Sequence, residues 1–392
     1  MQLSDLFTSR MRDLLPPLWG PGDANFPSRI SLAFGDADPT MFPREELLGA
    51  IETTLAEDID AALNYGPTYP GLVAIAAERL RRRGIPANEK NTLVSYGSSQ
   101  IIGLLPQVLV EPGDTVIVEA PSFLGAVMQF RRAGARLVGI PVDAEGMDVE
   151  LLATTLASLQ AQGIRPKFIY TIPTFQNPTG ATLSLARRKR LLELAMHYGV
   201  LVVEDDAYSD LRFRGEEVPP IAALGGEGWV IHLRTFSKIL APGVRLGWAS
   251  GPQALIDRLE ICKVEGSSGP FITRVVARYA ADGRLDTHIA ALRASYSAKC
   301  DLMLAALARE IPGASMARPD GGFFIWLRLP PGLSAGTVVP TASEFGVDVL
   351  AGPRCFADGS GDEYIRLAFS YATAAQIGEG VARLGAAVRS LL

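Results

Sequence analysis

The 392-residue sequence predicts an α/β fold, in which a large domain is built on a mainly parallel, doubly wound sheet and a smaller domain is α+β. Short β-rich segments alternate with helical patterns over most of the chain, as repeated βα units do. Several of these segments are apolar at successive positions, which is typical of strands covered on both faces. After about residue 280 the alternation gives way to one long helix, two strands and a final helix.

The strands of the large sheet are predicted from the β-rich segments. They lie at residues 92–97, 115–121, 137–142, 167–173, 200–206 and 229–237. Residues 184–199 are predicted to form one of the intervening helices because their apolar positions keep helical spacing. Gly199 is a suitable C-cap for that helix.

The last part of the chain predicts the smaller domain. A long helix is predicted at residues 287–311, and strands at residues 321–330 and 363–372. We therefore expect a large domain over residues 46–280. An N-terminal arm and a small C-terminal domain would comprise residues 1–45 and 281–392.

Composition and charge exclude several classes of protein. Hydrophobic residues make up 48% of the chain and charged residues 20%, which predicts a folded core rather than disorder. The net charge is −5, and the one basic block, residues 79–83, is predicted to be the solvated end of a helix. We therefore expect no nucleic-acid partner.

The cysteines, the histidines and the hydropathy of the chain exclude further classes of protein. The three cysteines contain no CxxC pair, which argues against a disulfide framework and favours a reducing cytoplasm. The three histidines lack metal-binding spacing, so we expect no metal site. No signal peptide is apparent and no apolar run is long enough to span a bilayer, so we expect no membrane association.

Polar and turn-forming residues follow the predicted strands. The strand exits carry the sequences YGSSQ, EAPSF, TIPTFQNPTG, EDDAY and RTFSK. Ligands of doubly wound sheets bind outside the carboxyl ends of the strands. We therefore expect these exits to form one crevice.

Lys238 lies in the largely apolar segment TFSKILAPGVRLGW, residues 235–248. A buried ammonium is costly unless it has partners or a chemical task. A partly desolvated lysine amine can form a Schiff base, and pyridoxal phosphate is the cofactor that most often uses one. This cofactor needs a phosphate anchor, a carboxylate at its ring nitrogen, donors to its phenolic oxygen and a surface against its ring.

A phosphate anchor is predicted at the start of the helix that follows the first strand. Gly97, Ser98 and Ser99 precede the helical pattern QIIGLL, and a helix N-terminus binds anions. Ser237 and Arg245 flank Lys238 and could complete the anchor. Taken alone, residues 97–99 are more typical of an ordinary N-cap than of an anion site.

The other cofactor contacts also have candidates. Asp205 or Asp206 ends an apolar strand, and we choose Asp205 for the ring nitrogen because Tyr208 follows three residues later. Tyr208 and Asn177 could donate to the phenolic oxygen. Phe123 could cover the ring, although a core aromatic gives the same pattern.

Arg366 is the candidate for the carboxylate of an amino-acid substrate. It lies in YIRLAFS of the predicted smaller domain, where its apolar neighbours disfavour an ordinary surface position. A guanidinium there would couple substrate binding to closure between the domains.

The segments TFSKILAPGVRLGW, QNPTG, EDDAY and YIRLAFS, in this order, resemble fold-type I pyridoxal-phosphate aminotransferases of class I/II. The subgroup of aminoadipate and kynurenine aminotransferases is the most similar. The resemblance implies the fold-type I architecture, with residues 46–280 as the cofactor-binding domain. It also implies that Lys238 forms the Schiff base, and that the residues above hold cofactor and substrate in transamination between an L-amino acid and a 2-oxo acid.

The resemblance further implies a homodimer with shared active sites. Tyr65 of NYGPTYPG would reach the cofactor phosphate of the partner subunit, and Gly35 would belong to the segment that closes over the substrate. The chain departs from the family at Ala37, at Phe123, where the family has tyrosine, and at residues 347–359. The last departure, which includes Arg354, lies near the expected substrate side chain.

Two alternatives stay open from the sequence. The same scaffold supports other pyridoxal-phosphate reactions, such as those of β-lyases, decarboxylases and racemases. A pyridoxal-phosphate-binding regulatory protein is the second alternative. We disfavour it because the stretch before the matched region is too short for a DNA-binding domain with its linker.

Overall fold

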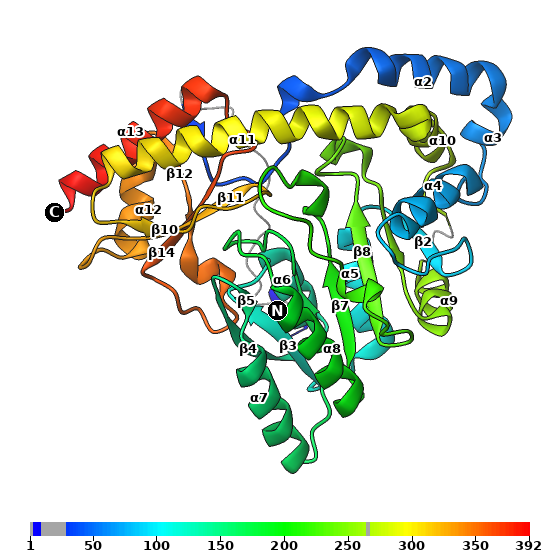
Figure 1. Cartoon of the computed structure of the whole chain (residues 1–392), viewed down its shortest axis with the longest axis horizontal. Helices are drawn as coiled ribbons and strands as arrows, with labels where there is room; N and C mark the ends of the chain where they lie inside the picture. The colour runs from blue at the N-terminus through cyan, green and yellow to red at the C-terminus, as the bar shows by residue number, and fades with distance from the viewer. Residues whose placement is uncertain (1–2, 9–28, 264–266) are drawn as a thin grey trace.

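The computed structural model describes residues 3–8, 29–263 and 267–392 (Figure 1). Its main feature is an eight-stranded sheet with the order β2-β9-β8-β7-β6-β3-β4-β5. The bounds in this order are β2 Thr92–Ser95, β9 Gly247–Ser250, β8 Val230–Thr235, β7 Leu201–Asp205, β6 Phe168–Thr171, β3 Thr115–Ala120, β4 Arg136–Asp143 and β5 Gly146–Met147.

The large sheet is mainly parallel, as the sequence predicts. Strands β8, β7, β6, β3 and β4 run parallel to one another, whereas β9 is antiparallel to both of its neighbours and β5 to β4. All of the strands predicted for this sheet are present. The short strand β9 was not predicted, because its four residues GWAS overlap the end of the Lys238 segment and show no periodic pattern.

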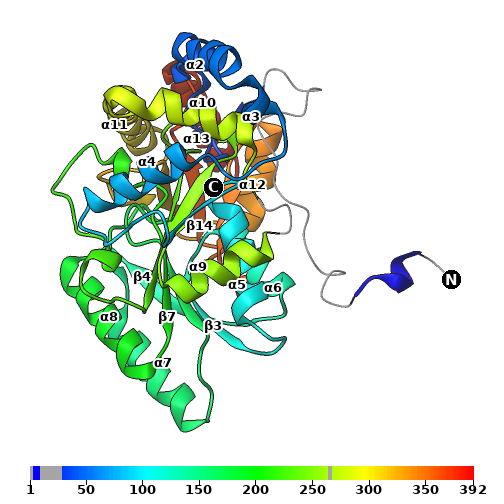
Figure 2. The same ribbon diagram turned by 90° about the vertical axis from the view of Figure 1, so that its right-hand side faces the viewer.

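Helices cover both faces of the large sheet (Figure 2). The helices of this part of the chain are α2 Arg44–Glu57, α3 Ile59–Leu63, α4 Pro70–Arg81, α5 Ser98–Leu109, α6 Leu124–Arg132, α7 Val149–Ala161, α8 Leu185–Tyr198, α9 Gln253–Cys262 and α10 Pro270–Ala280. Helices α2 and α3 pack against α10. In Figure 2, α7 and α8 lie on one side of the strands, and α5, α6 and α9 on the other.

Two apolar cores result from this arrangement. Ile117 of β3 belongs to the core under α7 and α8, whereas its neighbours Val116 and Val118 belong to the core under α5 and α6. Successive residues of a strand point to opposite faces. A strand that is buried on both faces is therefore apolar at successive positions, which is the pattern in the sequence.

The last part of the chain forms a second, antiparallel sheet with the order β10-β11-β14-β13. Its strands are β10 Ser315–Met316, β11 Phe324–Arg328, β14 Tyr364–Ala368 and β13 Leu350–Ala351, and the short pair β1 Ile30–Ser31 and β12 Val347–Asp348 lies apart from it. The accompanying helices are α11 Arg284–Glu310, α12 Ala335–Glu344 and α13 Ala374–Ser390. Helix α11 extends along the molecule from α10 to α13 (Figure 1). Within the described ranges, no helix is both long and apolar enough to cross a membrane.

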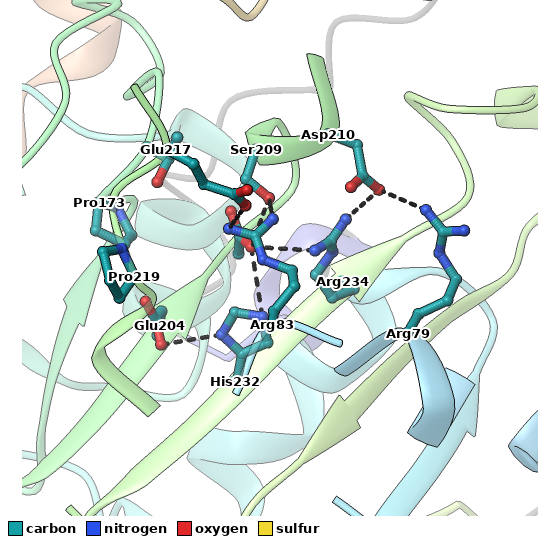
Figure 3. A network of polar contacts seen from close by, with 12 residues as sticks. Arg79, Arg83, Pro173, Glu204, Ser209, Asp210, Glu217, Pro219, His232 and Arg234 are labelled. Carbon is teal, nitrogen blue, oxygen red and sulfur yellow. Dashed lines mark hydrogen bonds and ion pairs between the residues drawn. The ribbon is translucent and has the colours of Figure 1, made fainter. Parts of the chain in front are cut away.

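A buried ionic network joins α4 to strands β7 and β8 (Figure 3). His232 Nδ1 lies 2.9 Å from Glu204, and His232 Nε2 lies 3.4 Å from Asp206. Asp206 also lies 3.6 Å from Arg83 and 3.3 Å from Arg234. The charges compensate one another, as buried ionic groups require.

The network corrects one expectation about the basic block at residues 79–83. Arg81 and Arg82 are solvated and pair with Glu78. The side chains of Arg79 and Arg83, however, are only 13% and 11% exposed. Arg79 lies in the last turn of α4 and Arg83 lies two residues beyond its end, and both contact carboxylates that follow β7.

Two groups of the network have pKa values that favour their charged forms. Burial by itself would raise the pKa of Asp206, but Arg83 and Arg234 hold it well below its usual value. Burial by itself would lower the pKa of His232, but Glu204 and Asp206 raise it. The network therefore depends on each charge retaining its partner.

Replacing Asp206 with asparagine should destabilise the protein. Asp206→Asn leaves Arg83, Arg234 and His232 without a shared counter-charge, so we expect the free energy of unfolding to fall by about 3–5 kcal/mol. Denaturant unfolding followed by circular dichroism would measure this loss. The control is Asp286→Asn, because Asp286 is 50% exposed at the edge of the same network. We expect that control to lose less than about 1 kcal/mol, and equal losses in both variants would contradict the account.

Candidate active site

A cavity of about 620 Å³ lies at the carboxyl ends of the central strands. Its wall combines residues that follow strands of the large sheet with residues of the small sheet, among them Phe324, Leu350 and Arg366. All of the site residues predicted from the sequence line this cavity except Tyr65. The sheet topology explains why these residues lie together, because parallel strands end at one edge of their sheet.

Lys238 lies just after β8 and extends into the cavity. Its Nζ donates a hydrogen bond to the carbonyl oxygen of Gly35 at 2.7 Å. This approach of the chain requires glycine at position 35, since a Cβ there would lie 2.3 Å from the ring of Phe324. The N-terminal segment is thereby held over the lysine.

The burial of Lys238 favours its neutral amine. Burial lowers its pKa to about 8, and Arg366 and Arg245 act in the same direction. Asp36 and Asp205 partly oppose the shift. A lysine with this pKa has an appreciable fraction of nucleophilic free amine near neutral pH.

Asp205 presents one carboxylate oxygen without a donor. Tyr170 donates to its Oδ2 at 2.6 Å. Its Oδ1 is buried and has no hydrogen-bond partner among the described residues. Burial raises the pKa of Asp205 to about 6. An unsatisfied buried oxygen of this kind is costly, so it indicates a place for a donor from a bound ligand.

The N-terminus of α5 faces the cavity beside Arg245. The helix begins at Ser98, two residues before the QIIGLL pattern, and Gly97 is its N-cap with a φ of +74°. A Cβ at Gly97 would lie 3.1 Å from Nη2 of Arg245. Ser99 and Ser237 line the same wall. Free N–H groups at a helix start and a guanidinium together form an anion-binding site.

Arg366 is buried in the opposite wall. Its Nη1 donates to Asn177 at 2.9 Å and its Nη2 to the carbonyl oxygen of Ala33 at 2.5 Å. The guanidinium carbon lies 4.3 Å from the ring centroid of Phe324. In the part of the chain that the structure describes, no carboxylate forms an ion pair with it. Arg366 is therefore a buried cation held by neutral groups.

Tyr208 and Phe123 complete the predicted set inside the cavity. Burial raises the pKa of Tyr208, whereas Arg366 and a hydrogen bond with Asn177 oppose the rise. Tyr208 is therefore a phenol that can donate a hydrogen bond. Phe123 is half-buried at the N-cap of α6 and forms part of the wall.

Comparison with known proteins agrees with this geometry. The family model described as aminotransferase class I and II matches residues 36–384. Aromatic-amino-acid aminotransferase 1 of Thermococcus litoralis is 40% identical over 92% of this chain and 88% of its own length. The chain belongs to the class I and II aminotransferases.

Two further relatives cover nearly the same span. The 2-aminoadipate transaminase of Thermus thermophilus is 36% identical over 93% of this chain and 91% of its own length. The crystal structure of Pyrococcus horikoshii kynurenine aminotransferase superposes with a TM-score of 0.92 at 36% identity, covering 99% and 98% of the two chains. The protein is thus a pyridoxal-phosphate-dependent aminotransferase of fold type I, as the resemblance in its sequence implies.

Some residues that support the wall of the aminotransferase cavity were not found from the sequence. Tyr170 contacts Asp205 but belongs to no motif. Glu119 accepts hydrogen bonds from Thr171 at 2.6 Å and from Gln176 at 3.0 Å, and so holds the turn that carries Asn177. Burial raises the pKa of Glu119 to about 7. Neither role leaves a local signal, because the partners are more than thirty residues apart in the chain.

Labelling of Lys238 in the cofactor-free aminotransferase should follow its lowered pKa. An amine-reactive reagent, with the product quantified by mass spectrometry, should label Lys238 half-maximally near pH 8. Asp36→Asn removes an anion that favours the ammonium form, so the midpoint should fall. Arg366→Met removes a cation that disfavours it, so the midpoint should rise. Shifts of the same sign in both variants would contradict the electrostatic account.

Proposed function

We propose that the cavity around Lys238 transfers the amino group of an L-amino acid to a 2-oxo acid. The observation that carries the proposal is the position of one lysine, with a pKa lowered to about 8, between an anion site and an isolated buried arginine. Pyridoxal phosphate supplies a protonated ring that stabilises negative charge on the α-carbon of the substrate. The protein must bind the cofactor and the substrate, orient them and transfer a proton.

The cavity residues fit this cofactor. The free Oδ1 of Asp205 would accept from the ring nitrogen, and Tyr170 would keep the carboxylate in place. Tyr208 and Asn177 would contact the phenolic oxygen, and Phe123 would cover the ring. The phosphate would bind at the N-terminus of α5, where the proposed contacts are Gly97, Ser98, Ser99, Ser237 and Arg245.

Lys238 and Arg366 act on the substrate in this proposal. Arg366 binds the α-carboxylate, which supplies the anion that its neutral neighbours do not. The Lys238 amine takes the proton from the α-carbon and delivers it again, and a pKa near the working pH suits a general base. The carbonyl oxygen of Gly35 orients Nζ for this task.

The two groups belong to different domains in the division that we propose, with residues 46–280 forming the cofactor-binding domain. Residues 1–45 and 281–392 form the arm and the small domain that contributes Arg366. Substrate bound by both domains would favour their closure and exclude water. The three cysteines are unpaired, which supports a cytoplasmic location.

We also propose a homodimer in which Tyr65 completes the phosphate site of the partner subunit. The Tyr65 side chain is fully exposed and lies outside the cavity of its own chain. Ile59 and Leu63 of α3 are 51% and 63% exposed beside it. An exposed apolar group of this kind is typical of a surface that another chain covers.

Conversion of the bound cofactor tests the reaction. Adding an L-amino acid without a 2-oxo acid should convert the holoenzyme to its pyridoxamine-phosphate form with one 2-oxo acid per site, quantified by chromatography. Lys238→Ala should slow this conversion at least about 100-fold because the general base is lost. Lys189→Ala is the matched surface control. Full turnover in Lys238→Ala would contradict the assignment, and release of ammonia with regenerated cofactor would indicate a lyase instead.

Removal of one hydroxyl tests the shared site. Tyr65→Phe should weaken cofactor binding about 10-fold, because a hydrogen bond to a charged phosphate is lost while the ring is kept. Cofactor dissociation can be followed by fluorescence, and the oligomeric state by light scattering. A monomeric holoenzyme, or unchanged affinity in Tyr65→Phe, would contradict the proposed dimer site.

A further inference from the structure

Arg354 is a further guanidinium in the wall of the cavity, beside those of Arg245 and Arg366. It lies in the short 3-10 helix Gly352–Cys355, directly after β13. In that strand Leu350 is paired with Arg366 of β14, so the two arginines come from adjoining elements. Burial raises the pKa of the neighbouring Cys355 thiol to about 11, and both guanidinium groups oppose that rise.

Arg354 lacks a counter-ion within the described ranges of the chain. No carboxylate there lies within ion-pair distance of it, and its Nε is buried without a hydrogen-bond partner. Other cations of the cavity have a task under the proposed function: Lys238 holds the cofactor, Arg245 its phosphate and Arg366 the α-carboxylate. A partly buried guanidinium without an anion is costly, so the ligand is the expected source of the anion.

The segment that carries Arg354 is held in place from two sides. The Ser122 amide donates to the carbonyl oxygen of Cys355 at 2.8 Å, and Arg131 donates to that of Ala357. These contacts tie the segment to the loop after β3 and to α6. Arg354 is thus a preorganised group of the cavity wall rather than part of a free loop.

Apolar side chains form part of the same cavity wall. Leu350, Phe324, Phe34 and Met128 line the same cavity. This composition suits a substrate whose two charged ends are separated by methylene groups. Arg132 also lines the cavity, but it is exposed at the end of α6 and its charge is screened by solvent.

We propose that Arg354 binds the distal carboxylate of dicarboxylic amino acids and 2-oxo acids, while Arg366 binds the α-carboxylate. This inference rests on the proposed function, since it takes Arg366 and Lys238 in the roles given there. It makes Arg354 a specificity-determining residue. A guanidinium fork matches a carboxylate in geometry as well as in charge.

The test compares two amino acids of equal carbon number. Formation of pyridoxamine phosphate by the holoenzyme is timed with L-glutamate and with L-norvaline, which has a methyl group where glutamate has its distal carboxylate. The wild-type enzyme should prefer glutamate. Arg354→Gln should lower the glutamate-to-norvaline ratio of kcat/KM by about 10- to 100-fold, since one charge-assisted contact is lost. Arg354→Lys should retain part of the preference.

Arg132→Gln is the matched control, because it removes another cation of the same cavity. Its ratio should stay within about fivefold of wild type. An equal loss for both amino acids in Arg354→Gln, or an unchanged ratio, would overturn the proposal. A wild-type enzyme that converts norvaline but not glutamate would overturn it and leave the proposed function standing.

Failure of the enzyme to convert any amino acid would contradict the proposed function. A binding measurement would still test the role of Arg354 in that case. Calorimetry of the holoenzyme should give tighter binding of glutarate than of valerate. Arg354→Gln should weaken glutarate binding at least about 10-fold and reduce the difference between the two acids. Equal affinities in the wild-type enzyme would overturn the inference.

Discussion

Three consecutive carboxylates at the end of β7, Glu204, Asp205 and Asp206, point to opposite sides of the sheet. The cavity depends on this arrangement, because it places Asp205 alone on the cavity side. Glu204 and Asp206 both contact His232, on the side where Arg83 follows the end of α4. Asp205 lies between them in the chain and reaches the cavity and Tyr170 instead. Successive side chains of a strand point to opposite faces of the sheet, so Asp205 must point away from the side that Glu204 and Asp206 share. The ionic network thus secures the end of the strand from which Asp205 extends.

The cavity itself carries more positive than negative charge. The cations Lys238, Arg132, Arg245, Arg354 and Arg366 line it, against the anions Asp36 and Asp205. Such a site is electrostatically incomplete without anions, and a phosphate together with one or two carboxylates would supply them. The same imbalance contributes to the lowered pKa of Lys238, so the groups that would bind the ligand also prepare the amine.

The two walls of the cavity contribute groups with different tasks. The large sheet contributes the lysine, the carboxylate and the anion site, which are the groups that a cofactor requires. Strand β14 contributes Arg366 and the short helix after β13 contributes Arg354, and under the proposed function both would bind the part of the substrate that does not react. The departure of this chain at residues 347–359 falls in the second wall, since Leu350 and Arg354 line the cavity.

The sequence by itself determined the fold class, the strands of the parallel sheet and the segments that meet at their ends. Apolar runs, turn residues and the motif around Lys238 are local signals, and the matching family model agrees with them. Tyr170, Glu119 and the buried positions of Arg79 and Arg83 were decided only by the tertiary structure. Their partners are distant in the chain, so no local pattern records them. The sequence does not show which carboxylate, if any, pairs with a given arginine. The folded structure shows that Arg83 has several carboxylate partners, whereas Arg354 has none among the described residues.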